Sequence, residues 1–161
     1  MTGLIIVIVA ILSVVGSVVW VRPSKRDVKL AKWRLEARQA GLYVKLDGLV
    51  AEPKDSGIRD DIGGASYYLY ETKSDKQDQL EWAVVKTQGW LQQGLPDEWS
   101  WYRQEMSLNH QQLQSLIASL PISVDAIERT PKYSRVIWGE SGQDFDAQQL
   151  KQFLQQVQAL A

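Results

Sequence analysis

The hydrophobic pattern along the chain begins with an uninterrupted apolar run. Residues 3–21, which read GLIIVIVAILSVVGSVVWV, carry no charge. A helix of this length extends about 28 Å, close to the thickness of the hydrocarbon core of a bilayer. Strands of globular domains are much shorter, so the length of the run predicts a transmembrane helix rather than a buried strand. Trp20 lies at the apolar–polar boundary, where indole rings are enriched.

The run does not match a cleaved signal peptide. Only Met1 and Thr2 precede it, so a basic leading segment is missing. Bulky residues 18–21 close it, and no A-x-A pattern of small residues stands near its end. We therefore expect an uncleaved signal anchor.

Positive charge follows the apolar run and is missing before it. Residues 22–38 hold seven basic against two acidic side chains, a local net charge of +5, while the rest of the chain carries −6. Lys and Arg next to a span favour the cytoplasmic side. This predicts a single-pass bacterial inner-membrane protein with its N-terminus outside, and with basic side chains that contact the anionic headgroups of the bilayer. The predicted membrane-surface contacts are Trp20, Arg22, Lys25, Arg26, Lys29 and Lys32.

Shorter periodic segments follow. Ser24 and Asp27 predict the start of a helix over residues 25–40, and Gly41 predicts its end. This basic helix, within residues 22–41, reads either as a solvated linker near lipid or as a docking helix. Residues 47–65 are rich in Gly, Asp and Pro and predict a solvated loop. The alternation of apolar positions predicts strands at 42–46 and 98–104, hairpins at 65–72 with 80–87 and at 122–129 with 133–140, and helices over 109–120 and from Asp144 or Asp146 to the end.

Together these segments predict the fold class and its division. Residues 3–21 are the transmembrane helix, residues 22–41 the basic juxtamembrane helix, and residues 42–161 one cytoplasmic α+β domain. In that domain we expect antiparallel hairpins with two amphipathic helices on one face of the sheet.

The composition offers little catalytic chemistry. The chain has no Cys and one His, His110, which excludes thiolate sites and His clusters. The sequence contains no phosphate-binding, dinucleotide-binding or nucleophile-elbow motif. The loop carboxylates Glu52, Asp55, Asp60 and Asp61 lack the spacing of a calcium loop. Because the body is acidic, we expect no nucleic-acid partner. The sequence thus predicts no catalytic residue, no metal ligand and no cofactor.

Tryptophan is the more informative residue type. Trp82 and Trp138 fall in predicted strands and are expected in the core. Trp90, Trp99 and Trp101 lie in or near loop-like sequence, where they are candidate partner-binding residues because Trp is enriched at interface hot spots. Burial of these rings as a lid over the sheet is the alternative.

The span followed by RPSKRDVKLAKWRLEARQAG, residues 22–41, resembles the start of YajC, the accessory subunit of the bacterial Sec translocon. The resemblance covers residues 1–41 and stops there, because YajC proteins continue with a "TxGG"-like segment that this chain lacks. The overall layout is also similar to uncharacterised membrane-anchored proteins of gammaproteobacteria.

These observations favour a non-enzymatic protein with an α+β interaction domain, which acts as an accessory or scaffold subunit and binds a membrane or peripheral protein. Two alternatives remain. One is a membrane-tethered lipid- or peptide-binding module that uses Trp90, Trp99 and Trp101. The other is an enzyme with a carboxylate-based site.

Overall fold

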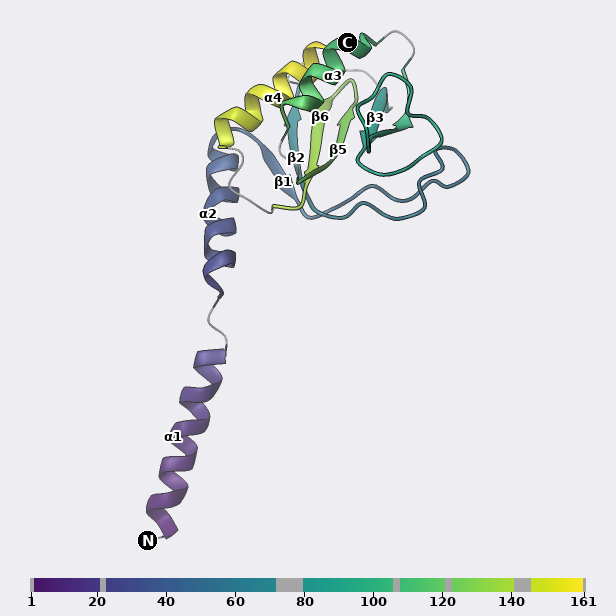
Figure 1. The fold of residues 1–161 in the computed structure, drawn as a ribbon. Helices are drawn as coiled ribbons and strands as arrows, with labels where there is room; N and C mark the ends of the chain where they lie inside the picture. Colours follow the sequence, from purple (N-terminus) through teal and green to yellow (C-terminus); the bar gives the residue numbers. More distant parts are fainter. Residues whose placement is uncertain are drawn as a thin grey trace. The chain divides into compact units, whose positions relative to one another are not determined.

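The computed structural model describes residues 2–20, 23–71, 80–105, 108–120, 123–140 and 146–160, and in the first helix it describes the side chains of residues 3–13 (Figure 1). The chain divides into two compact units, Met1–Trp33 and Arg34–Ala161. Ten helices and strands are named in the described residues, and all strands belong to the second unit.

The first unit contains helix α1 (Thr2–Trp20) and the beginning of helix α2 (Lys25–Gln39). Across the part of the chain that the structure describes, none of the helices combines the length and the apolar character that crossing a membrane requires. The predictions of a transmembrane helix, of a signal anchor and of a single-pass inner-membrane location with a cytoplasmic domain are therefore wrong. A helix that spans a membrane has to match the hydrocarbon thickness with continuous apolar sequence.

The ends of α2 follow local chemistry that the sequence predicts. At its start, the Asp27 backbone N–H donates to Ser24 Oγ at 3.1 Å and the Ser24 N–H donates to Asp27 Oδ2 at 3.1 Å. This reciprocal capping box satisfies amide groups that have no partner within the helix. At its end, Gly41 adopts φ +94°, and the Leu42 N–H reaches back to the Ala37 carbonyl at 3.0 Å. Both predicted caps are confirmed.

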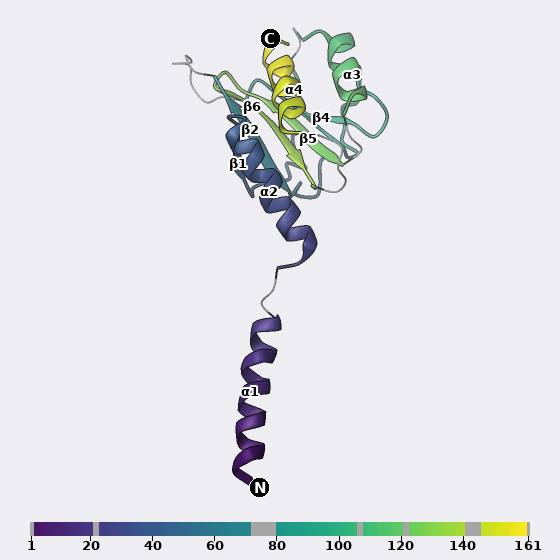
Figure 2. The ribbon, with the colours of Figure 1, turned by 90° about the vertical axis from the view of Figure 1, so that its left-hand side faces the viewer.

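The second unit is built on a six-stranded antiparallel sheet in the order β1-β2-β6-β5-β3-β4 (Figures 1 and 2). Its class is α+β. The strands are β1 (Tyr43–Lys45), β2 (Ala65–Tyr70), β3 (Trp82–Val85), β4 (Ser100–Arg103), β5 (Val124–Arg129) and β6 (Tyr133–Trp138).

The pairing of the strands confirms one predicted hairpin and contradicts the other. β5 and β6 form the hairpin that turns at residues 130–132, with Glu128 opposite Arg135. By contrast, β2 does not pair with β3; it lies between β1 and β6, while β3 lies between β5 and β4. The predicted hairpin of 65–72 with 80–87 is therefore wrong. Strand patterns reveal which segments are extended, but the β5–β6 hairpin is inserted between these two strands by contacts far apart in the sequence.

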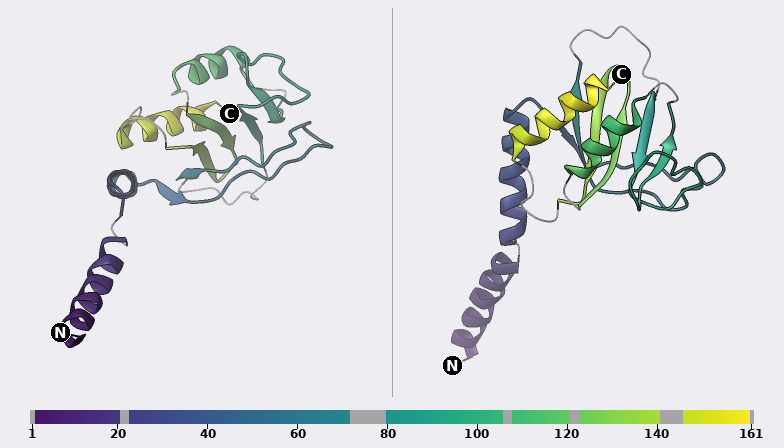
Figure 3. Two further views of the ribbon diagram at one scale, coloured as in Figure 1. Left: turned by 60° about the horizontal axis from the view of Figure 1, so that its bottom comes forward. Right: turned by 45° about the horizontal axis from the view of Figure 1, so that its top comes forward.

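Helices α3 (His110–Ala118) and α4 (Ala147–Ala159) lie on one side of the sheet (Figure 3). α4 packs across β6 and β2, and α3 packs beside α4. The apolar stripe of α4 is buried, and Ser134 Oγ on β6 donates to the Leu154 carbonyl at 3.0 Å. Asn109 caps α3 and Asp146 caps α4, the latter in a capping box with Gln149. The amphipathic periodicity of the two helices thus determines which of their faces pack against the sheet.

The loop between β1 and β2 covers part of the opposite side of the sheet (Figure 3, left). Leu49 and Ile58 from this loop are buried against Ala83, Val85 and Ile137 of the sheet, and Ile62 packs beside them. The Tyr102 hydroxyl ties the loop to β4 by donating to the Val50 carbonyl at 3.1 Å. The segment predicted as a solvated loop therefore supplies part of the hydrophobic core.

Candidate functional site

The tryptophan-rich segment contains two different environments. Trp99 and Trp101 are buried, with 6% and 1% of their surface exposed, whereas Trp90 is 66% exposed. The Trp101 indole N–H donates to the Gln93 carbonyl at 3.0 Å, and its ring lies 5.6 Å from that of His110. Trp99 and Trp101 are therefore part of the hydrophobic core. Of the three predicted partner-binding residues, Trp90 is the one with an exposed side chain.

Trp90 is exposed but held in place. Its backbone N–H donates to the Ser56 carbonyl at 2.9 Å. Its ring lies directly against Gly57, so closely that a Cβ atom at position 57 would sit 2.4 Å from the ring's Cδ1. Gly57 has φ +79°, a conformation that glycine adopts without strain. The loop between β1 and β2 thus forms a flat floor under the indole.

The backbone on both sides of Trp90 is also fixed. The Gly89 N–H donates to Ser100 Oγ at 2.9 Å, and that hydroxyl donates to the Thr87 carbonyl at 2.6 Å. On the other side, the Trp101 N–H donates to the Leu91 carbonyl at 2.8 Å, while the Leu91 side chain is 48% exposed. Binding at this surface would require little additional ordering, which lowers its entropic cost. The sequence reveals the candidate tryptophan but gives no signal for its glycine floor.

The two segments that form this surface are acidic. Residues 47–62 hold five acidic and two basic side chains, and residues 86–99 hold two acidic and one basic. Asp55, Asp97 and Glu98 are exposed, and Asp55 directly precedes the Ser56–Gly57 floor. The exposed Trp90 and Leu91 therefore lie where two segments of net negative charge meet.

A buried carboxylate network, absent from the sequence predictions, joins α2 to the segment after β6. Glu140 Oε1 accepts from Arg34 Nε at 2.8 Å; its carboxylate also accepts from Arg34 Nη2 and from the Tyr67 hydroxyl. The hydrogen bond to Glu140 raises the pKa of Arg34, and burial followed by the bond to Glu140 raises the pKa of Tyr67. Glu140 is 8% exposed and has φ +50°.

A second network lies within the sheet. Glu128 pairs with Arg135 and accepts from the Tyr133 hydroxyl at 2.7 Å. Arg135 Nη1 donates to the Tyr68 hydroxyl at 2.9 Å, and that hydroxyl donates to Asp47 Oδ2 at 2.9 Å. Burial opposes the charge of Arg135, but Glu128 and Tyr68 outweigh it and raise its pKa.

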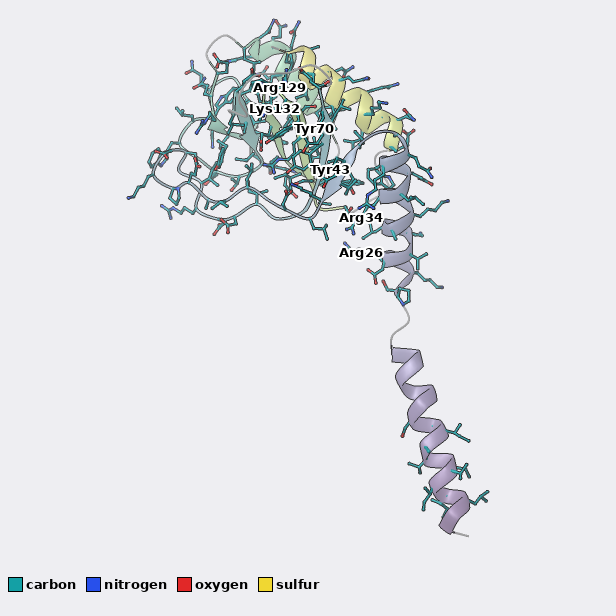
Figure 4. All side chains as sticks on the ribbon, turned by 180° about the vertical axis from the view of Figure 1, so that it is seen from behind. Arg26, Arg34, Tyr43, Tyr70, Arg129 and Lys132 are labelled. Carbon is teal, nitrogen blue, oxygen red and sulfur yellow. The ribbon has the colours of Figure 1, made fainter. Side chains whose placement is uncertain are left out.

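Four tyrosines, Tyr43, Tyr68, Tyr70 and Tyr133, lie close together beside this network. The labelled Tyr43 and Tyr70 are neighbours in Figure 4. The ring of Tyr68 contacts those of Tyr43, Tyr70 and Tyr133 at centroid distances of 5.1–6.4 Å. Lys45 Nζ lies 5.8 Å from the Tyr68 ring centre, and the Arg135 guanidinium lies 5.4 Å from it. Because two cationic side chains of this chain already lie over the Tyr68 ring, we interpret the tyrosine cluster as part of the packing within the domain.

Burial raises the pKa of Asp125, opposed by the charge of Lys86. A paired acid–base site needs a second carboxylate beside such a group. Among the described residues, no three His, Asp or Glu side chains come together as a metal site would require. His110 packs on Gly94 and Trp101.

The predicted membrane-surface residues lie near the start of α2 and just before it. Lys25, Arg26, Lys29 and Lys32 are exposed on the helix. Trp20 ends α1, but its side chain is not among those described, and Arg22 lies outside the described residues. Contact with anionic headgroups stays a prediction.

Comparison of the chain with protein-family models, with curated proteins and with solved structures gives no significant match. The resemblance of residues 1–41 to YajC therefore stays a prediction.

Proposed function

We propose that this chain is a non-enzymatic interaction domain, an accessory or scaffold subunit, which binds a segment of another protein at Trp90. The observation that supports the proposal most is the combination of exposure and order at one large aromatic side chain. Trp90 is 66% exposed, yet its backbone is bonded to Ser56 and its ring rests on Gly57. Rigid exposed tryptophans are typical anchors of protein interfaces.

The surroundings of Trp90 indicate the chemistry of the bound segment. Leu91 adds apolar surface beside Trp90, and the segments 47–62 and 86–99, which meet at Trp90, both carry a net negative charge. An interface combines an apolar centre with a rim of complementary charge. The expected partner segment therefore carries an aromatic or aliphatic side chain flanked by Lys or Arg.

The proposal is tested by selecting displayed random 12-residue peptides on the full-length protein. Selected peptides are then synthesised, and their affinity is measured by isothermal titration calorimetry. We expect the enriched peptides to combine Lys or Arg with a large apolar residue. Trp90→Ala should weaken binding by about 2 kcal/mol or more, roughly thirtyfold, as for other hot-spot residues. Added salt should weaken it further, because the rim contacts are electrostatic.

Two further variants separate the ring from general surface effects. Leu46→Ala removes another exposed apolar side chain, 71% exposed, and should leave the affinity unchanged. Gly57→Ala keeps Trp90 but places a methyl group where the ring lies, so it should weaken binding nearly as much as Trp90→Ala. Peptides that bind equally well to wild type and to Trp90→Ala would refute the proposed site.

A further inference from the structure

Most of the exposed side chains on the outer surface of the helical layer are glutamines. The exposed glutamines of the two helices are Gln111, Gln112 and Gln114 on α3, and Gln148, Gln149, Gln152, Gln155 and Gln156 on α4. Within these two helices, both of which are described throughout, Lys151 is the single Asp, Glu, Lys or Arg, and it is partly buried. Typical soluble domains carry about 25% charged residues overall. This surface therefore lacks the charges that normally keep helices apart in solution.

A shallow groove of about 590 Å³ lies between α3 and α4 on this surface. Its lining carries no charge and includes Asn109, Gln112, Ser115 and Leu116 on one side, and Gln156 and Ala159 on the other. Small side chains at Ser115 and Ala159 leave room for a helix to approach closely. The groove thus offers uncharged hydrogen-bonding groups around a shallow apolar strip.

The absence of charge constrains the occupant of this surface. A charged partner would lose solvation at the groove and find no opposite charge to compensate. The carboxamide of Gln carries both donors and acceptors, so one glutamine surface can satisfy a second identical one. In a two-fold dimer each patch meets its own copy, which disfavours surfaces of one charge sign and permits neutral amide surfaces.

We propose that a second copy of this chain occupies the groove, so that the α3–α4 surfaces of two molecules form a two-fold dimer. In this arrangement α3 of each molecule lies in the groove of the other, and Ser115 of one molecule meets Ala159 of its partner. The dimer surface contains none of the residues around Trp90, so this inference stands apart from the proposed partner binding.

Site-directed cross-linking tests the dimer, because the chain has no cysteine of its own. Full-length Ser115→Cys and Ala159→Cys proteins are mixed and treated with a short bismaleimide. The control pair is Gln88→Cys, on an exposed loop, mixed with Ala159→Cys. We expect cross-linked dimers from the first mixture and only background from the second. Equal yields from the two mixtures would overturn the proposal. They would show that two molecules meet at the groove no more often than at an unrelated loop.

Charge substitutions then test the interface itself. Gln112→Glu with Gln156→Glu places like charges on both sides of the two-fold axis and should lower the cross-linked yield at least about tenfold. The control, Gln88→Glu with Gln93→Glu, has the same net charge and should leave the yield unchanged. Mixing the Glu protein with a Gln112→Lys, Gln156→Lys protein should restore cross-linking. A yield that both Glu pairs leave unchanged would refute the glutamine interface.

Discussion

Tyr67 and Tyr68 are consecutive residues of β2, and each leads into its own network of arginine and carboxylate on opposite faces of the sheet. The Tyr67 hydroxyl donates to Glu140, which Arg34 binds through two nitrogens. The Tyr68 hydroxyl accepts from Arg135, which pairs with Glu128. The first network joins α2 to the segment after β6, while the second lies within the strands and the adjoining loop.

The two networks differ in how well water can solvate the charge that remains when one partner of a pair is removed. The Arg34 side chain is 29% exposed, so water can solvate it when its carboxylate is lost. The side chains of Glu128 and Arg135 are each 7% exposed, so water has little access to either charge. Removing one partner of a fully buried pair leaves an uncompensated charge, which costs more than the pair itself contributes. The sheet network should therefore be the more sensitive of the two.

The largest effect is expected from Glu128→Ala. It leaves Arg135 buried without its closest carboxylate, with Asp47 at 3.8 Å as the remaining acidic partner, so the free energy of unfolding should fall by about 3 kcal/mol, the lower end of the usual range. Urea denaturation followed by circular dichroism measures the change. Adding Arg135→Met removes the buried positive charge and should recover part of the loss. A double variant less stable than Glu128→Ala would contradict this account.

A smaller effect is expected from Glu140→Ala. Arg34 and Tyr67 lose a charged hydrogen-bond partner at the edge of the domain, which should cost about 1.5–3 kcal/mol. Glu140 also has φ +50°, a conformation that strains a residue with a Cβ atom. Glu140→Gly should therefore be more stable than Glu140→Ala, by about 1 kcal/mol. Equal stabilities of the two variants in the same urea assay would show that the backbone conformation carries no strain.

Much of the fold is encoded in short stretches of sequence. The caps Ser24, Gly41 and Asn109 act on neighbouring amides or carbonyls, so they can be predicted without knowledge of the rest of the chain. The β5–β6 hairpin is likewise local, and its register brings Glu128 opposite Arg135. The register of this hairpin, which follows from its turn and its alternating residues, is therefore a signal that could have identified the Glu128–Arg135 pair.

Other features depend on contacts that no local pattern encodes. Leu49 and Ile58 enter the core from a Gly- and Asp-rich loop with no periodicity, and the floor beneath Trp90 requires that loop to reach a distant segment. The environments of Trp90 and Trp101 differ although only eleven positions separate them. The pairing of Arg34 with Glu140, 106 residues apart, is equally invisible in the sequence.

The last effect is absent at neutral pH, appears only under alkaline conditions and isolates one tyrosine of the sheet network. Burial, partly opposed by the charge of Arg135, raises the pKa of Tyr68 to about 12 from an ordinary value near 10. Between these values the unfolded chain releases the phenolic proton while the folded protein keeps it. Stability is therefore lost as pH rises from about 10 to about 12, by about 1.4 kcal/mol per pH unit from Tyr68. Tyr68→Phe should reduce the slope of unfolding free energy against pH by that amount, whereas parallel slopes for the two proteins would contradict the raised pKa.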